Sequence, residues 1–110
     1  MSAPERYRVE WASVARDDLH AIVDHVADDD VVAALSVLRK IEDAAGSLTT
    51  TPARGRVVPE LAGVGVQSYR ELIVPPWRLV YRVAGRSVYV LGVFDGRRNM
   101  EDVLLERFVR

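Results

Sequence analysis

The segment YRELIVPPWRLVYRV, residues 69–83, decides the fold. It contains two runs of β-branched, aromatic and apolar residues that meet at Pro75-Pro76. Such runs, joined by a short turn, predict two antiparallel strands over residues 67–74 and 77–84. A second turn at residues 84–86 leads into a third predicted strand, residues 87–95, and the three strands form a meander.

Upstream of this meander the pattern predicts a strand followed by two helices. Residues 7–11 alternate between apolar and charged side chains, which is typical of a half-buried strand that joins the same sheet. Ser13 is the expected N-cap of a helix that ends at the DDD run, residues 28–30. The last aspartates of that run are expected to cap a second helix, which ends at TTTP, residues 49–52. The short connection predicts an antiparallel helix hairpin.

The remaining segments are a loop and a short C-terminal helix. Residues 53–66 are rich in glycine and proline and are expected to form a loop, and Asn99 is the expected cap of the last helix. The predicted fold is therefore α+β: a twisted antiparallel sheet of about four strands, with the N-terminal helix hairpin on one face and a short C-terminal helix. We expect residues 1–110 to form a single domain, with the other face of the sheet partly open.

Composition narrows the class of protein. Hydrophobic residues make up 49% and charged residues 28% of the chain, which is typical of a globular domain. No uncharged stretch has the length and character of a transmembrane helix, and the N-terminal residues lack a signal-peptide pattern. The absence of cysteine excludes disulfides and thiolate chemistry and is compatible with the cytoplasm, where we expect the protein to be.

The charges are divided unevenly along the chain. Residues 1–53 carry five basic and ten acidic side chains, a net charge of −5, whereas residues 54–110 carry ten basic and six acidic side chains, a net charge of +4. This division suggests two surfaces with different partners. Fourteen of the fifteen cations are arginine, the residue best suited to bidentate contacts with carboxylates or phosphates, although an arginine-rich coding bias explains that ratio equally well.

Three of these arginines lie within the predicted strands. Alternation places Arg78 and Arg82 on one face, opposite the apolar set that includes Leu79 and Tyr81. If the register also brings Arg70 to that face, three guanidinium groups gather on the open side of the sheet. The alternative is that each arginine lies flat on a solvated surface and pairs with Glu71 or Asp95 across strands.

The motifs of the chain closely resemble the RelE/ParE superfamily of toxins from bacterial toxin–antitoxin systems. The resemblance rests on P-x-x-G-R at residues 52–56, YRELIV, WRLVYRV and VYVLGVFDGRR, together with the helical VARDDLHAIVDHVADD, and it covers residues 7–110. It implies a cognate antitoxin as partner. It also implies one of two activities: RelE-like members cleave mRNA in the ribosome, and ParE-like members inhibit DNA gyrase without a known catalytic constellation.

The RelE-like alternative has a specific set of candidate residues. Arg70 resembles the strand arginine that these nucleases use on phosphate, and Arg97 or Arg98 resembles a second arginine after the last strand. If the chain is a nuclease, the candidate catalytic residues are Arg70, Arg82, Asp95, Arg97 and Arg98. The chain lacks the lysines and the terminal tyrosine of some nucleases, and it has Asp95 where many have histidine. It therefore lacks most of the side chains that would transfer protons during RNA cleavage.

These departures favour a ParE-like toxin, a growth inhibitor that a cognate antitoxin neutralises and that inhibits DNA gyrase. The expected antitoxin-binding residues are Arg56, Arg70, Arg78 and Arg82. The alternatives are a RelE-like mRNA endonuclease, whose partners are the ribosome and mRNA, and a non-toxic member that only binds an antitoxin. We expect no cofactor, no membrane partner and no metal, because His20 and His25 fall about 140° apart around one helix.

Overall fold

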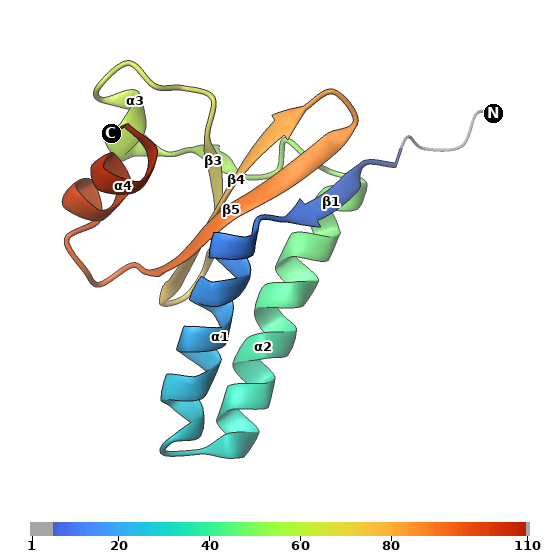
Figure 1. The fold of residues 1–110 in the computed structure, drawn as a ribbon. Coiled ribbons are helices and arrows are strands. Elements are labelled where there is room, and N and C mark those ends of the chain that lie inside the picture. Colours follow the sequence, from blue (N-terminus) through green and yellow to red (C-terminus); the bar gives the residue numbers. More distant parts are fainter. Residues whose placement is uncertain (1–5, 110) are drawn as a thin grey trace.

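The computed structural model describes residues 6–109, which form a sheet with helices on both of its faces (Figure 1). In chain order the elements are β1 (Arg8–Trp11), α1 (Ser13–Ala27), α2 (Val31–Gly46), the 3₁₀ turn η1 (Ser47–Thr49), β2 (Arg56–Val57), α3 (Pro59–Ala62), β3 (Arg70–Val74), β4 (Trp77–Ala84), β5 (Ser87–Asp95) and α4 (Met100–Phe108). The predicted order of strand, helix hairpin, three-stranded meander and terminal helix is confirmed.

The sheet differs from the predicted antiparallel sheet in two ways, an additional strand and the parallel direction of β1. Its order is β1-β5-β4-β3-β2, with β1 parallel to β5 and every other pair antiparallel. The estimate of about four strands missed β2, which lies inside the predicted loop 53–66 together with the helix α3. A strand of two residues is too short to carry an alternating pattern, so only its pairing with β3 reveals it.

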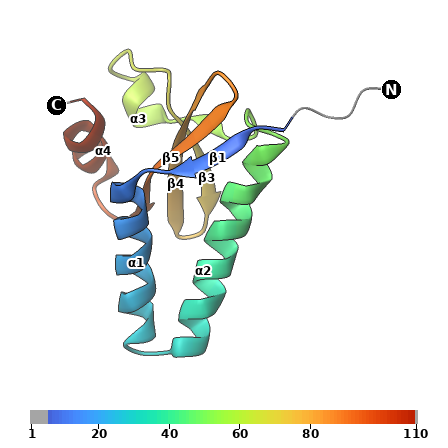
Figure 2. The same ribbon diagram turned by 45° about the vertical axis from the view of Figure 1, so that its right-hand side comes forward.

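The two long helices form the predicted antiparallel hairpin, whose tip extends beyond the sheet (Figures 1 and 2). Asp30 caps α2 as predicted, since its carboxylate accepts a hydrogen bond of 3.0 Å from the amide of Ala33. The prediction that Ser13 caps α1 is wrong. Ala12 holds the N-cap position without a side-chain hydrogen bond, and Ser13 is the first helical residue.

A large apolar core lies between the hairpin and the sheet. Ile41 of α2 and Leu48 of η1 are fully buried in one cluster with Leu79 and Tyr81 of β4 and Val90 of β5. The pairing of β4 with β5 shifts register between Val80 and Tyr81. On the two sides of this irregularity Leu79 and Tyr81 both face the helices, as the alternation predicted.

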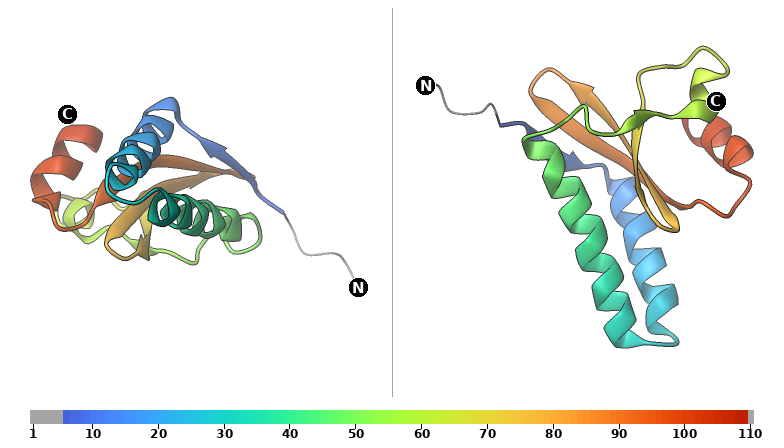
Figure 3. Two further views of the ribbon diagram at one scale, coloured as in Figure 1. Left: turned by 90° about the horizontal axis from the view of Figure 1, so that it is seen from below. Right: turned by 180° about the vertical axis from the view of Figure 1, so that it is seen from behind.

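A second, smaller core covers part of the opposite face. The helices α3 and α4, which contribute to this core, lie beside each other at one end of the sheet (Figure 3). Val80 and Phe94 point away from the hairpin and pack with Leu61 of α3 and Leu104 of α4. The face that was expected to be partly open is therefore closed at one end, because residues 58–62 fold back as a short helix instead of a free loop. None of the helices between residues 6 and 109 has the length and apolar character that crossing a membrane requires.

We expect the helix hairpin to depend on Ile41. This side chain is fully buried, so Ile41→Ala should lower the free energy of unfolding by about 2–5 kcal/mol, as measured by urea denaturation. Leu35→Ala, in the same helix but 58% exposed, is the matched control and should change it by less than about 0.5 kcal/mol. Equal losses in the two variants would contradict the packing described here.

Candidate functional site

The register of the sheet separates the three strand arginines. Arg70 lies opposite Tyr81, whereas Ile73 lies opposite Arg78. Because opposed residues share a face, Arg70 is on the helix side of the sheet and Arg78 is on the other side. The predicted cluster of three guanidiniums on one open face is therefore wrong. A one-residue difference in register decides this question, and the two-residue turn at Pro75-Pro76 sets the register by pairing Val74 with Trp77.

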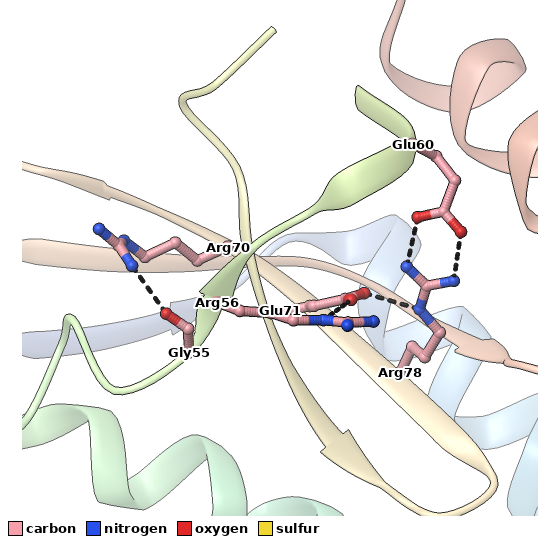
Figure 4. A network of polar contacts seen from close by, with 6 residues as sticks. All are labelled: Gly55, Arg56, Glu60, Arg70, Glu71 and Arg78. Carbon is pink, nitrogen blue, oxygen red and sulfur yellow. Dashed lines mark hydrogen bonds and ion pairs between the residues drawn. The ribbon is translucent and has the colours of Figure 1, made fainter. Parts of the chain in front are cut away.

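Arg78 is held between two carboxylates (Figure 4). Its two terminal nitrogens donate to the Oε2 and Oε1 of Glu60 at 2.8 and 2.6 Å, and its Nε donates to Oε1 of Glu71 at 2.7 Å. The arginine side chain is only 9% exposed. These contacts use the donors that an external carboxylate or phosphate would need, so Arg78 is part of the fold and was mistaken for an exposed residue.

Glu71 joins two arginines from neighbouring strands. Its side chain is fully buried, and its Oε2 accepts a hydrogen bond of 2.7 Å from Nε of Arg56. Arg56 and Glu71 are directly paired between β2 and β3. The side chain of Arg56 remains 59% exposed, so it covers the buried carboxylate while one edge of the guanidinium faces solvent.

Glu60 reaches this network from the first turn of α3, where Pro59 starts the helix. The hydrogen bond from the Arg78 side chain lowers the pKa of Glu60 below its ordinary value, against the opposing effect of burial. The same bond raises the pKa of Arg78, which stays charged at every physiological pH. The network thus fastens α3 to the outer face of the sheet and ties β2 to β3.

A second polar contact joins the loop before β2 to the helix side of the sheet. The hydroxyl of Tyr81 accepts from the amide of Gly55 at 2.9 Å and donates to the carbonyl of Pro52 at 2.8 Å. Arg70 donates through one terminal nitrogen to the carbonyl of Gly55 at 2.7 Å. A Cβ on Gly55 would come within 2.5 Å of the Glu71 carbonyl, so this position in the P-x-x-G-R motif requires glycine.

Asp95, the candidate proton acceptor, is hydrogen-bonded by a residue of the turn that follows it. Its carboxylate accepts hydrogen bonds from the backbone amide, Nε and a terminal nitrogen of Arg97 at 3.0, 2.9 and 2.8 Å. The side-chain hydrogen bonds from Arg97 lower the pKa of Asp95 to about 2. A carboxylate this acidic is a weak base, so Asp95 is poorly suited to remove a proton from a hydroxyl group.

The candidate nuclease residues are distributed along the sheet instead of gathered. Arg70 is opposite Tyr81, which in turn is opposite Val90, and Asp95 lies five residues farther along β5. At the rise of a β-strand this separates Arg70 from Asp95 by roughly 15 Å along the sheet. Arg82, opposite Tyr89, lies on the far side of Arg70 from Asp95, and Arg97 and Arg98 follow Asp95.

The exposed members of the predicted antitoxin-binding set are Arg56, Arg70 and Arg82. Arg82 is exposed on the outer face, where its strand neighbour Tyr89 is 37% exposed. Arg70 is partly exposed, with one nitrogen committed to Gly55. These three residues, without Arg78, remain able to bind a partner's carboxylates.

Sequence reasoning missed an ion pair that joins the two ends of the chain. Arg107 of α4 donates through both terminal nitrogens to Asp18 of α1, at 2.9 and 3.0 Å. The Asp18 carboxylate also accepts from the amide of Val93 in β5, and the Arg107 guanidinium lies over the ring of Phe94. The partners are separated by 89 positions in sequence, and no local pattern identifies such a pair.

Solved structures of toxin–antitoxin systems have this fold. A chain of the chromosomal ParDE system from P. aeruginosa superposes with a TM-score of 0.69 at 24% identity, covering 83% of this chain and 97% of that one. A chain of the toxin–antitoxin complex RelBE2 from Mycobacterium tuberculosis gives a TM-score of 0.59 at 21% identity, covering 86% and 97%. At such identities the likeness establishes the fold.

The sequence itself places the chain in a family. Residues 9–100 match the model of the ParE toxin of the type II toxin–antitoxin system parDE. The protein therefore belongs to the ParE toxin family, within the RelE/ParE superfamily that its motifs resemble. A comparison with curated proteins found no match.

We expect Arg78 and Arg82 to differ sharply in their effect on stability. Arg78→Ala leaves Glu60 and the buried Glu71 without their shared partner and should cost about 3 kcal/mol in urea denaturation, since Glu71 keeps only Arg56. Arg82→Ala removes an exposed side chain and should cost less than about 0.5 kcal/mol. A stable Arg78→Ala protein would contradict a structural role for the network.

The Glu60–Arg78 pair should also make stability depend on pH. The pKa of Glu60 is lower in the folded protein, so the pair stabilises above the ordinary value of 4.5, and this contribution is lost as pH falls through the lowered pKa. Glu60→Gln should therefore melt below the parent at pH 7, and the gap should narrow in acid. A gap that stays constant from neutral to acid pH would show that the charge of Glu60 is unimportant.

Proposed function

We propose that the protein inhibits growth by binding DNA gyrase, that a cognate antitoxin neutralises it, and that it acts in the cytoplasm, where gyrase works on DNA. Membership in the ParE toxin family supports this proposal. The two similar solved structures come from toxin–antitoxin systems, which supports an antitoxin as partner. In this function the protein acts by binding, and its side chains need not carry out a reaction.

The observation that carries the proposal is the separation of Arg70 from Asp95 along the sheet. RNA cleavage by 2′-hydroxyl attack needs a proton acceptor, a proton donor and a cation around one phosphate. Here Arg70 lies roughly 15 Å from Asp95 along the sheet, and Arg97 occupies the Asp95 carboxylate. Of the strand arginines, Arg78 lies nearest to Asp95, and it is engaged by Glu60 and Glu71. This arrangement speaks against the RelE-like mRNA endonuclease.

For the antitoxin we propose a segment rich in carboxylates that contacts Arg56, Arg70 and Arg82. Arginine offers a fork of N–H donors that suits carboxylates, and Arg56 and Arg82 are exposed while Arg70 is partly exposed. Because Arg56 and Arg82 lie on the outer face and Arg70 lies on the helix face, a segment that touches all three must cross an end or edge of the sheet. A non-toxic protein that only binds an antitoxin would use the same residues.

Gyrase inhibition can be separated from mRNA cleavage directly. The purified protein should inhibit supercoiling of relaxed plasmid DNA by gyrase, and it should leave mRNA intact on translating ribosomes at the same concentration. Asp95→Asn should inhibit gyrase like the parent, because Asp95 has no part in the proposed action. Ribosome-dependent cleavage that Asp95→Asn abolishes would establish the endonuclease instead, and inactivity in both assays would favour the non-toxic alternative.

Antitoxin binding should depend on Arg82 and on salt. Arg82→Ala should weaken the affinity for the antitoxin encoded beside the toxin roughly 10-fold, since a charge-assisted contact contributes about 1.5 kcal/mol. The loss should shrink as salt is raised above physiological strength, where charges are screened over about 8 Å. Isothermal titration at several salt concentrations measures both effects. Arg86→Ala, at the neighbouring β4–β5 turn, is the matched control, and an equal loss there would show that only overall charge matters.

A further inference from the structure

β1 is an edge strand, and its outer edge carries unpaired backbone groups. It pairs with β5 on one side and has no strand on the other in the part of the chain that the structure describes. Just after β1 the amide of Ala12 donates to the carbonyl of Val90 in β5. By alternation, the backbone groups of Val9 and Trp11 point away from β5, and no residue between 6 and 109 forms a hydrogen bond with them. These two donors and two acceptors have the spacing that an additional strand requires.

The beginning of this edge is already covered, which argues against a second copy of the chain as the added strand. The amide of Tyr7 donates to the carbonyl of Thr49 in η1 at 2.7 Å. An antiparallel copy centred on Val9 would bring its Trp11 onto Tyr7, where Thr49 lies. A copy centred on Glu10 would place two carboxylates directly opposite each other, which is destabilising. The edge therefore suits a strand of a different sequence.

A groove between the two long helices adjoins β1. This helix groove has a volume of about 380 Å³, and its lining combines Trp11 of β1 with Leu19, His20 and Val23 of α1 and Leu38 of α2. Charged side chains of both signs complete the lining. In Figure 2, β1 passes across the ends of α1 and α2 that lie nearest the sheet. The volume lies within the range of pockets that receive a ligand group.

Strand alternation connects the edge with the helix groove. Val9 and Trp11 pack against the core on the helix side of the sheet. In an additional strand, the residues opposite them lie on that same side, so a side chain beside Trp11 points toward the helix groove. Leu19 and Leu38 offer it an apolar contact. When a strand is added to a sheet, main-chain hydrogen bonds supply affinity, and pockets for alternate side chains supply specificity.

On the outer face, β1 continues the surface that bears Arg82. The side chain of Arg8 is 77% exposed, and its guanidinium pairs with Glu10 at 4.0 Å, the limit for an ion pair. Arg8 lies opposite Ser87 of β5. Ser87 in turn lies opposite Ala84 of β4, two residues beyond Arg82. Arg8 and Arg82 are therefore roughly 10 Å apart across the strands and roughly 7 Å apart along them, and one carboxylate-rich segment can contact both.

We infer that an extended segment of the antitoxin joins the sheet as an additional strand beside β1 and places an apolar side chain in the helix groove. The inference rests on the proposed antitoxin partner and adds to it the position and the sequence pattern of the bound segment. In that pattern an apolar residue faces the helix groove and an acidic residue faces Arg8. The segment is extended because the backbone of a strand matches the alternating donors and acceptors of the edge.

The backbone part of the contact is tested by replacing Val9. Val9→Pro removes an N–H group that makes no bond with β5, and proline is tolerated at such positions of edge strands, so its circular dichroism should match the parent. Val9→Ala is the matched control, because it shortens the same side chain and keeps the N–H group. In isothermal titration with the antitoxin encoded beside the toxin, Val9→Pro should bind roughly 10-fold more weakly than Val9→Ala, because a hydrogen bond is lost and the edge is obstructed.

The groove is tested independently at an exposed position, so that the result does not depend on the folding of Val9→Pro. His20→Trp adds a bulky ring to the lining of the helix groove and should weaken antitoxin binding roughly 10-fold, since it displaces the apolar side chain of the antitoxin. His25→Trp is the matched control. His25 is also exposed on α1 but lies about 140° farther around the helix, so this variant should bind like the parent.

The possible outcomes separate this inference from the proposed function. An antitoxin that fails to bind the parent would contradict the proposed function and the inference together. Tight binding to the parent with equal affinities for Val9→Ala and Val9→Pro, or for His20→Trp and His25→Trp, would overturn the inference alone. Loss of gyrase inhibition in Val9→Pro with unchanged antitoxin binding would assign the edge to gyrase, and a dimer of the parent that Val9→Pro abolishes would assign it to a second copy. Either result would also overturn the inference.

Discussion

The carboxylate of Glu71 has no access to solvent, and the polar contacts on the outer face of the sheet form around it. A buried charge is tolerated only when opposite charges and hydrogen-bond donors surround it, and Arg56 and Arg78 provide both. Arg78 in turn brings Glu60, and with it α3, down onto the sheet. The apolar contact of Leu61 with Val80 and Leu104 is made in the same place. Removing one charge from this group leaves others uncompensated, so its members act together.

This arrangement gives the two faces of the sheet different kinds of contact. The helix face is closed by an apolar core that includes Tyr81, whose buried hydroxyl is satisfied by Gly55 and Pro52. Burial raises the pKa of Tyr81, so the hydroxyl stays protonated and keeps donating to the Pro52 carbonyl. The outer face combines the ion network with the smaller apolar core around Phe94. The loop 53–66 is held from both sides, and this positions Arg56 and Arg70 at its margin.

How well the sequence predicted each feature depends on how far apart in the sequence the contacting residues lie. The strands, the helix hairpin and the caps at Asp30 and Asn99 follow from local spacing and were predicted correctly. The strand β2 and the Asp18–Arg107 pair depend on contacts between distant segments. The register that places Arg70 opposite Tyr81 follows from a local signal, the two-residue turn at Pro75-Pro76. Alternation predicted correctly that Arg78 shares a face with Val80. The alternative in which a strand arginine pairs with Glu71 describes Arg78. The second partner, Glu60, could not be foreseen, because it comes from a segment that reads as a loop.

The distribution of the arginines favours binding over catalysis. Catalysis of phosphate chemistry requires cations and a proton acceptor within a few ångströms of one another, held before the substrate arrives. Among the candidate site residues, Arg78 and Arg97 are paired with carboxylates of the same chain, and that pairing competes with an incoming phosphate. The other arginines expected to bind the antitoxin, Arg56, Arg70 and Arg82, are at least partly exposed and are divided between two faces. Cations spaced in this way cannot converge on one phosphate, but they can meet successive carboxylates of an extended polypeptide that passes around the sheet.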